Sequence, residues 1–153
     1  MRPGFWEFIP LEDLNAAEWE ALCDGCGKCC LLKLQDEVTD AVHYSSVFCR
    51  LFDPHLCRCG DYKHRQQRVK ECVVLTPQTI AESADWMPRS CAYRLRHEGK
   101  PLPAWHHLVS GDSESIHRQG MSLRGKSIRS EARVPDSRLE EHLLDDPLAG
   151  TLR

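Results

Sequence analysis

The chain has 153 residues, nine cysteines and a formal net charge of −3. This length is typical of one domain, and the slightly acidic balance argues against broad electrostatic binding to nucleic acid, which requires a basic face. No stretch approaches the roughly 18 apolar residues of a membrane span, and residues 1–10 lack the features of a secretory signal. We therefore expect a cytoplasmic protein with no membrane partner, in a compartment where thiols stay reduced and disulfides are rare.

The N-terminal third is predicted to contain one short helix followed by two strands. Asn15 is a suitable N-cap, and Glu18, three residues later, can complete a capping box. The predicted helix delivers the chain to Cys23. Residues 31–36 and 44–52 show strand-like alternation of side chains and are interpreted as strands.

The remainder is predicted to consist of loops and short helices. Residues 53–72 have few large hydrophobic side chains and read as irregular. Thr76, followed by proline, starts one helix, and Ser90 can cap a second. Residues 105–133 show little periodicity and are interpreted as an extended segment on the surface. Asp136 can cap a last amphipathic helix.

These elements predict an α+β fold, as a small irregular metal-stabilised domain with several short helices and few short strands. We expect one domain over residues 1–147. Its cysteine-rich part spans residues 23–91, and a cysteine-free extension follows over residues 100–147. Residues 148–153 are predicted to be a flexible tail.

The crowding of the cysteines indicates a shared metal site. Eight of the nine lie between Cys23 and Cys72. A C-x-x-C turn brings two sulfurs to one metal, and this spacing occurs twice over residues 23–29. The predicted ligands, enough for two four-thiolate sites, are Cys23, Cys26, Cys29, Cys30, Cys49, Cys57, Cys59 and Cys72. Cys91 is left either as a further ligand or as a small buried residue.

The spacing leaves two types of metal centre open. The C-x-x-C-x-x-C run over residues 23–29 resembles the first three cysteines of the bacterial ferredoxin pattern and favours an iron–sulfur cluster. Zinc is the alternative, although its sites more often pair two well-separated C-x-x-C elements. The partition of the ligands is not determined by the sequence. Adjacent cysteines in an extended chain point to opposite sides, so Cys29 and Cys30 are free to serve different sites.

The run Cys23-x-x-Cys26-x-x-Cys29-Cys30 resembles the signature of the bacterial CxxCxxCC proteins, a cysteine-cluster family described as zinc- or iron-chelating. The segments Cys57-x-Cys59-x-x-Tyr62 and Cys91-Ala-Tyr-Arg94 are similar to its YcgN-like branch, and the resemblance extends from about Phe5 to Pro147. The resemblance implies metal binding without an agreed reaction.

Three functions follow from these observations. The first is a metal-binding protein with a redox role or a role as a carrier of metal or clusters. The second is a metal-dependent enzyme that modifies a protein or small molecule. The third is an interaction module in which bound metal stabilises a docking surface for a protein partner. Candidate acid–base groups for the enzyme are His106, His107, Asp112 and His117, although a surface loop with solvated imidazoles is the simpler interpretation of the histidines.

Overall fold

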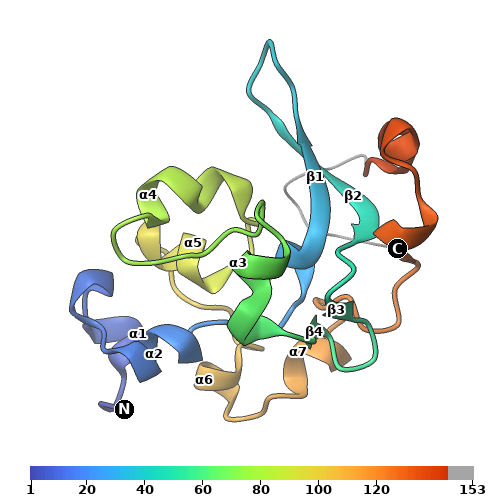
Figure 1. The fold of residues 1–153 in the computed structure, drawn as a ribbon. Helices are drawn as coiled ribbons and strands as arrows, with labels where there is room; N and C mark the ends of the chain where they lie inside the picture. Colours follow the sequence, from blue (N-terminus) through green and yellow to red (C-terminus); the bar gives the residue numbers. More distant parts are fainter. Residues whose placement is uncertain (145–153) are drawn as a thin grey trace.

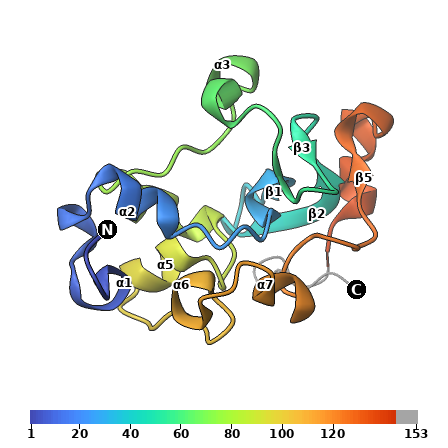
Figure 2. The same cartoon turned by 90° about the horizontal axis from the view of Figure 1, so that it is seen from below.

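A computed structural model describes residues 1–144 of the chain. The predicted tail over residues 148–153, together with the last three residues of the predicted domain, lies outside the described residues. The helices α1, α2, α4 and α5 lie on one side of the molecule, and the strands lie on the other (Figures 1 and 2).

Short helices form the N-terminal part of the fold. They are α1 (Phe5–Phe8), the 3-10 helix η1 (Leu11–Asp13) and α2 (Ala16–Ala21). The predicted capping box of α2 is confirmed, since Glu18 N donates to Asn15 Oδ1 at 2.9 Å and Asn15 N donates to Glu18 Oε2 at 3.1 Å. The buried Glu18 carboxylate also pairs with the Arg2 guanidinium at 2.6 Å, which fastens the start of the chain to α2.

Two small sheets follow the cysteine run. Their strands, with the preceding 3-10 helix, are η2 (Lys28–Cys30), β1 (Leu31–Gln35), β2 (Val42–Phe48), β3 (Phe52–Asp53), β4 (Arg58–Cys59) and β5 (Arg129–Ser130). β1 and β2 form an antiparallel hairpin that projects from the body (Figure 1), and β5 pairs with β2 in parallel. β3 and β4 pair antiparallel. Both predicted strands are found in the hairpin, but the second ends at Phe48, so that Cys49 lies beyond it.

The remaining elements are short helices. They are η3 (Tyr62–His64), α3 (Arg65–Arg68), α4 (Ile80–Ser83), η4 (Ala84–Trp86), α5 (Ala92–His97), α6 (His107–Ser110), α7 (Ser115–Arg118), η5 (Glu131–Arg133) and η6 (Asp136–His142). The predicted α+β class is therefore confirmed. Ser90 does not cap α5, since Cys91 is its N-cap and makes no side-chain cap bond. Residues 105–133 are more ordered than predicted, because they contain α6 and α7.

Two hydrophobic clusters form the core. The sheet cluster consists of Leu31, Val42, Tyr44, Phe52, Cys57 and Leu123. The helix cluster consists of Phe5, Leu11, Trp19, Leu22, Ile80 and Tyr93. Leu22 belongs to one cluster and Leu31 to the other, so residues 23–30, which we call the cysteine loop, join the two. The Tyr44 hydroxyl donates to the Trp86 carbonyl and provides a second link between β2 and the helical side.

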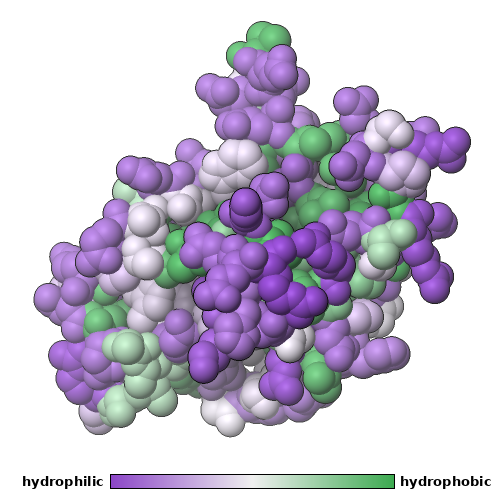
Figure 3. All heavy atoms as spheres, in the orientation of Figure 1, coloured by the Kyte–Doolittle hydropathy of each residue, from purple (hydrophilic) through white to green (hydrophobic). Residues whose placement is uncertain are grey.

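The surface is largely polar on the face drawn in Figure 3, with a strongly hydrophilic area over α3. Most residues between 62 and 70 are exposed. None of the helices in residues 1–144 has the length and apolar character needed to cross a membrane.

Candidate metal centre

The cysteine loop owes its tight turns to two glycines and one aspartate. Gly25 and Gly27 have φ values of 76° and 79°, a region that favours glycine. A Cβ on Gly27 would lie 2.8 Å from the Phe52 ring. Asp24 Oδ1 accepts a hydrogen bond from Cys26 N at 2.9 Å, and Cys26 Sγ accepts one from Lys28 N at 3.5 Å. Amide donors of this kind stabilise a thiolate sulfur.

Four thiols belong to the cysteine loop and to the start of α5. These helix-side thiols are Cys23, Cys26, Cys29 and Cys91. Burial, together with the charges of Asp24 and Cys29, raises the pKa of Cys26 well above its usual value and that of Cys91 to about 12. Cys23 is exposed but lies in a hollow of the surface, where desolvation and the charges of Asp24, Cys29 and Cys91 raise its pKa.

Four further thiols lie near the end of the hairpin. These sheet-side thiols are Cys30, Cys49, Cys59 and Cys72. Cys49 N donates to Cys30 O at 2.8 Å, and Phe52 N donates to Cys49 O at 2.8 Å. Phe52 pairs with Cys59 across β3 and β4, so three of the four residues are tied together through the backbone. Burial raises the pKa of Cys72, and the charges of Cys29 and Cys59 add to this effect.

Cys29 and Cys30 connect the two sets of thiols. They lie in the 3-10 helix η2 rather than in the extended segment assumed from the sequence, and their division between two sites stays a prediction. The neighbouring Cys30 thiol lowers the pKa of Cys29 to about 7, and Cys29 in turn raises the pKa of Cys30. Lys33 also lowers the pKa of Cys29, while its ammonium donates to the carbonyls of Cys29 and Leu31 at 2.9 Å each.

Two buried charged groups in the cysteine loop lack hydrogen-bond partners in the described part of the chain. They are the Lys28 ammonium and Oδ2 of Asp24. Lys28 is only 2% exposed, and its charge lowers the pKa of Cys26. A buried ion that makes no hydrogen bond costs several kcal/mol, and a metal held by thiolates carries negative charge that would add to that of Asp24 in balancing the ammonium. The residues present therefore fit an anionic metal–thiolate centre. Lys28 was not predicted from the sequence as part of the site, although a lysine inside a run of cysteines could have indicated a positive charge beside the thiols.

The side chains are not gathered tightly enough to form a finished metal site. No group of three or more Cys, His, Asp or Glu side chains within residues 1–144 is arranged to hold a metal ion. All nine cysteines are free thiols. The structure thus does not bring the sulfurs to ligating distance.

Cys57, one of the predicted ligands, lies in the sheet cluster. It is 2% exposed, and its thiol donates to the carbonyl of Cys26 at 3.4 Å. Burial is the main cause that raises the pKa of Cys57, and polar groups of Leu123 and Ser122 near the thiol oppose it. The side chain therefore contacts the backbone of the cysteine loop and the segment around Leu123.

The histidines fall into two environments. His106 is fully buried, with Nε2 2.9 Å from Leu22 O and Nδ1 accepting from Leu108 N at 3.1 Å. The interpretation of His106 as a solvated surface residue is therefore wrong, and its two bonds define a neutral structural imidazole. His107 and His117 instead line a pocket of about 330 Å³ that also contains Cys23.

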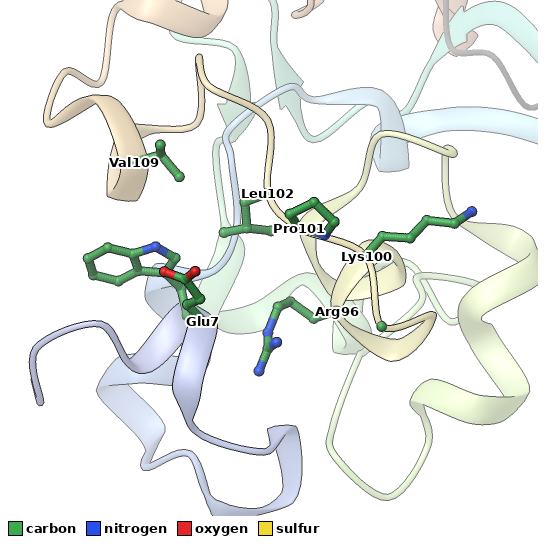
Figure 4. A pocket seen from close by; sticks show the side chains of 8 residues that line it. Glu7, Arg96, Lys100, Pro101, Leu102 and Val109 are labelled. Atoms are coloured by element: carbon green, nitrogen blue, oxygen red, sulfur yellow. The ribbon is translucent and has the colours of Figure 1, made fainter.

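A larger pocket of about 450 Å³ lies away from the thiols (Figure 4). Glu7 of α1, Arg96 of α5 and Lys100 are among its lining residues, and no cysteine is. It therefore offers no contact to a metal centre in the cysteine loop.

Comparison with known proteins agrees with this chemistry. Residues 22–92 match the family model CxxCxxCC, described as "Putative zinc- or iron-chelating domain", and the thiol-rich part of the chain is a domain of this class. This chain is 52% identical to UPF0260 protein RCAP_rcc02083 of Rhodobacter capsulatus, over 95% of this chain and 97% of that protein. It is 54% identical to a UPF0260 protein of Rhizorhabdus wittichii, over 94% of this chain and 96% of that protein. The chain therefore belongs to the UPF0260 family of CxxCxxCC proteins, as the resemblance indicated. No solved structure matches it.

Proposed function

We propose that this protein holds a cysteine-ligated metal centre, built from the clustered thiols, and uses it for electron transfer or for delivery of the metal or cluster. The buried Lys28 ammonium beside Cys26 is the observation that carries the proposal, because it requires nearby negative charge that the described residues do not supply by hydrogen bonding. A cytoplasmic location, where thiols stay reduced, is part of the proposal.

The charge balance supports such a centre. A Zn²⁺ ion bound by four thiolates has a net charge of about −2, and an oxidised four-iron cluster with four thiolates has about the same. Lys28 lies beside Cys26, and Lys33 lies near Cys29, Cys30 and Cys72. Desolvation lowers the pKa of Lys33, and the charges of these cysteines oppose the shift. Two ammonium groups would thus compensate much of the negative charge of one centre.

The spacing of the cysteines favours iron–sulfur over zinc, and spectroscopy distinguishes them. Protein purified without oxygen is expected to contain iron and sulfide, to absorb visible light, and to give an electron paramagnetic resonance signal after reduction. A colourless protein with stoichiometric zinc would identify zinc instead. The proposal would be refuted if protein isolated from metal-replete cells contained no iron and no zinc.

Removal of the metal provides an independent test of its structural role. A structural metal site contributes roughly 10–16 kcal/mol, comparable to the net stability of a domain at about 5–15 kcal/mol. Residues 53–72 hold Cys57, Cys59 and Cys72 but few large apolar side chains, so we expect chelation to open this segment to limited proteolysis. An unchanged cleavage pattern and unchanged circular dichroism after complete metal loss would contradict this role.

A metal-dependent enzyme is the second candidate, favoured by the pocket beside Cys23. His107 and His117 line this pocket together with the two cations Arg58 and Arg124. A centre with an open coordination position facing the pocket would accept an added ligand. The test is to add cyanide or a small thiol to the loaded protein. A changed spectrum supports the enzyme, whereas an unchanged spectrum supports a closed centre for binding or electron transfer.

A further inference from the structure

A basic surface covers the segment that separates Cys59 from Cys72. Residues 61–70 carry four lysine or arginine side chains and one aspartate, a formal charge of +3, whereas the whole chain carries −3. The surface, which we call the α3 surface, consists of Tyr62, Lys63, Arg65, Arg68 and Lys70. We propose that the α3 surface docks an acidic region of a protein partner that exchanges metal or electrons with the proposed centre. The inference rests on the proposed function and specifies the chemistry of its partner.

The positive charges of the α3 surface face the solvent. Lys63, Arg68 and Lys70 are exposed, and Arg65 is partly buried. Figure 2 shows α3 standing out from the body, and the face in Figure 3 is strongly hydrophilic there. Among residues 1–144, Arg68 pairs with Asp61, whereas Lys63, Arg65 and Lys70 form no ion pair. Exposed charges contribute little to the stability of a fold, so these cations remain available to a partner.

The α3 surface is held in place at both ends of its segment. The Tyr62 hydroxyl donates to Glu20 Oε2 at 2.8 Å, which joins one end to α2. Arg50, which follows β2, donates from Nη2 to Arg68 O at 2.7 Å and holds the other end. Between them the Arg65 guanidinium lies over the Tyr62 ring, 3.8 Å from its centroid, and donates to Tyr62 O at 2.7 Å. A surface that is fixed before binding loses less conformational entropy when a partner docks.

The residue types favour an acidic protein over other polyanions. Tyrosine and arginine are enriched among the residues that dominate the energetics of protein interfaces. The stacked pair of Tyr62, which is 50% exposed, and Arg65 offers such a centre, with the lysines around it. Nucleic acid requires a longer basic track and usually several aromatic rings for stacking, whereas the α3 surface has one ring and the rest of the chain is acidic.

The position of the α3 surface suits a partner that exchanges metal or electrons. Cys59 lies two residues before residues 61–70, and Cys72 lies two residues after them. Two residues of extended chain span only about 7 Å, so a partner on the α3 surface would lie beside two of the predicted metal ligands. Attraction between opposite charges raises association rates by about 10- to 1000-fold, which suits a brief complex.

Charge reversal tests the docking surface. A fluorescent polyglutamate peptide is titrated with the isolated protein at low ionic strength, where exposed charges are least screened. Lys63→Glu/Lys70→Glu is expected to weaken binding roughly tenfold or more and to leave the metal content unchanged. Arg89→Glu/Arg138→Glu is the matched control, because it alters the net charge equally at exposed residues outside the α3 surface. Equal weakening in the two variants would overturn the inference.

Single-stranded RNA of matched charge and vesicles of anionic lipid distinguish the classes of partner. Each is titrated in the same way as the peptide. Weaker binding of both than of the peptide supports an acidic protein. Tighter binding of either, lost in Lys63→Glu/Lys70→Glu, would overturn that choice of partner.

Cross-linking of the unsubstituted protein gives a second measurement that does not depend on a variant folding. A carbodiimide joins a glutamate carboxyl of the peptide to a lysine amine as an amide, with loss of water. Peptide mapping is expected to find the cross-links at Lys63 and Lys70, and cross-links mainly at Lys100 or Lys126 would overturn the inference. Absence of metal from the isolated protein would refute the proposed function instead, so the two failures are distinguishable.

Discussion

Replacing Lys28 with methionine should have opposite effects on the protein with and without metal. Methionine keeps much of the length and apolar character of the side chain but removes its charge. In the metal-free protein most thiols are protonated at neutral pH, because burial raises the pKa of neighbours such as Cys26. The buried Lys28 ammonium then lacks a full counter-ion, and its removal should stabilise the fold.

The magnitudes follow from burial and charge. Lys28 is 2% exposed, so its desolvation is nearly complete. Replacing a poorly paired buried ion with a well-packed apolar group stabilises by about 1–4 kcal/mol, and we expect a gain in this range for the metal-free protein. In the loaded protein the ammonium attracts the anionic centre. Two unit charges about 6 Å apart attract by roughly 3 kcal/mol at an effective dielectric constant of 20, which corresponds to on the order of 100-fold weaker metal binding.

Two assays separate these effects. Urea unfolding of chelated protein measures the change in stability without metal. Competition of zinc-loaded protein with a chromophoric chelator measures the change in metal affinity. Lys100→Met is the matched control, because Lys100 is exposed and pairs with Glu98 far from the cysteine loop, at the pocket in Figure 4. A Lys28→Met protein that is less stable without metal and binds metal as tightly as before would refute the reasoning.

Two further predictions concern the fold rather than the metal. The Arg2 side chain lowers the pKa of Glu18 from 4.5 to about 2, so its contribution to stability is present above pH 4.5 and is lost as the pH falls toward 2. Glu18→Gln keeps a capping-box partner but removes the titrating carboxyl group. In metal-free protein the melting temperature of this variant should therefore fall less steeply as the pH is lowered, and an unchanged slope would contradict the prediction. Gly27→Ala should destabilise by about 3 kcal/mol or more in urea unfolding, because the left-handed conformation costs roughly 1–2 kcal/mol and its Cβ would meet Phe52. Gly25→Ala, with nothing within 4 Å of its added Cβ, should lose only about 1–2 kcal/mol, and equal losses in the two variants would argue against the contact.

Local signals in the sequence predicted the features that depend on neighbouring residues. The capping box of Asn15 and Glu18 needs only three residues of chain, and the hairpin follows from alternation within each strand. These features depend on short-range geometry, which a single sequence contains.

The features that could not be predicted depend on contacts between distant segments. His106 is buried because it binds the carbonyl of Leu22, 84 residues away in the sequence. Cys57 enters the sheet cluster through contacts with Leu123 and with the loop around Cys26, and the spacing Cys57-x-Cys59 contains no sign of this. Spacing measures how far apart ligands lie along the chain, whereas burial decides which sulfurs remain available to a metal.

The position of the cysteine loop gives metal binding a consequence beyond the loop itself. Because Leu22 belongs to the helix cluster and Leu31 to the sheet cluster, the loop connects the two halves of the core. Cys91 is fixed to the helix side and Cys49 to the sheet side, while Cys29 and Cys30 touch each other in η2. Metal centres on the two sets of thiols would therefore tie each half of the core to the same short turn. Loss of metal should loosen the two halves relative to each other before either cluster unfolds, and hydrogen exchange should detect this first at the amides of the loop.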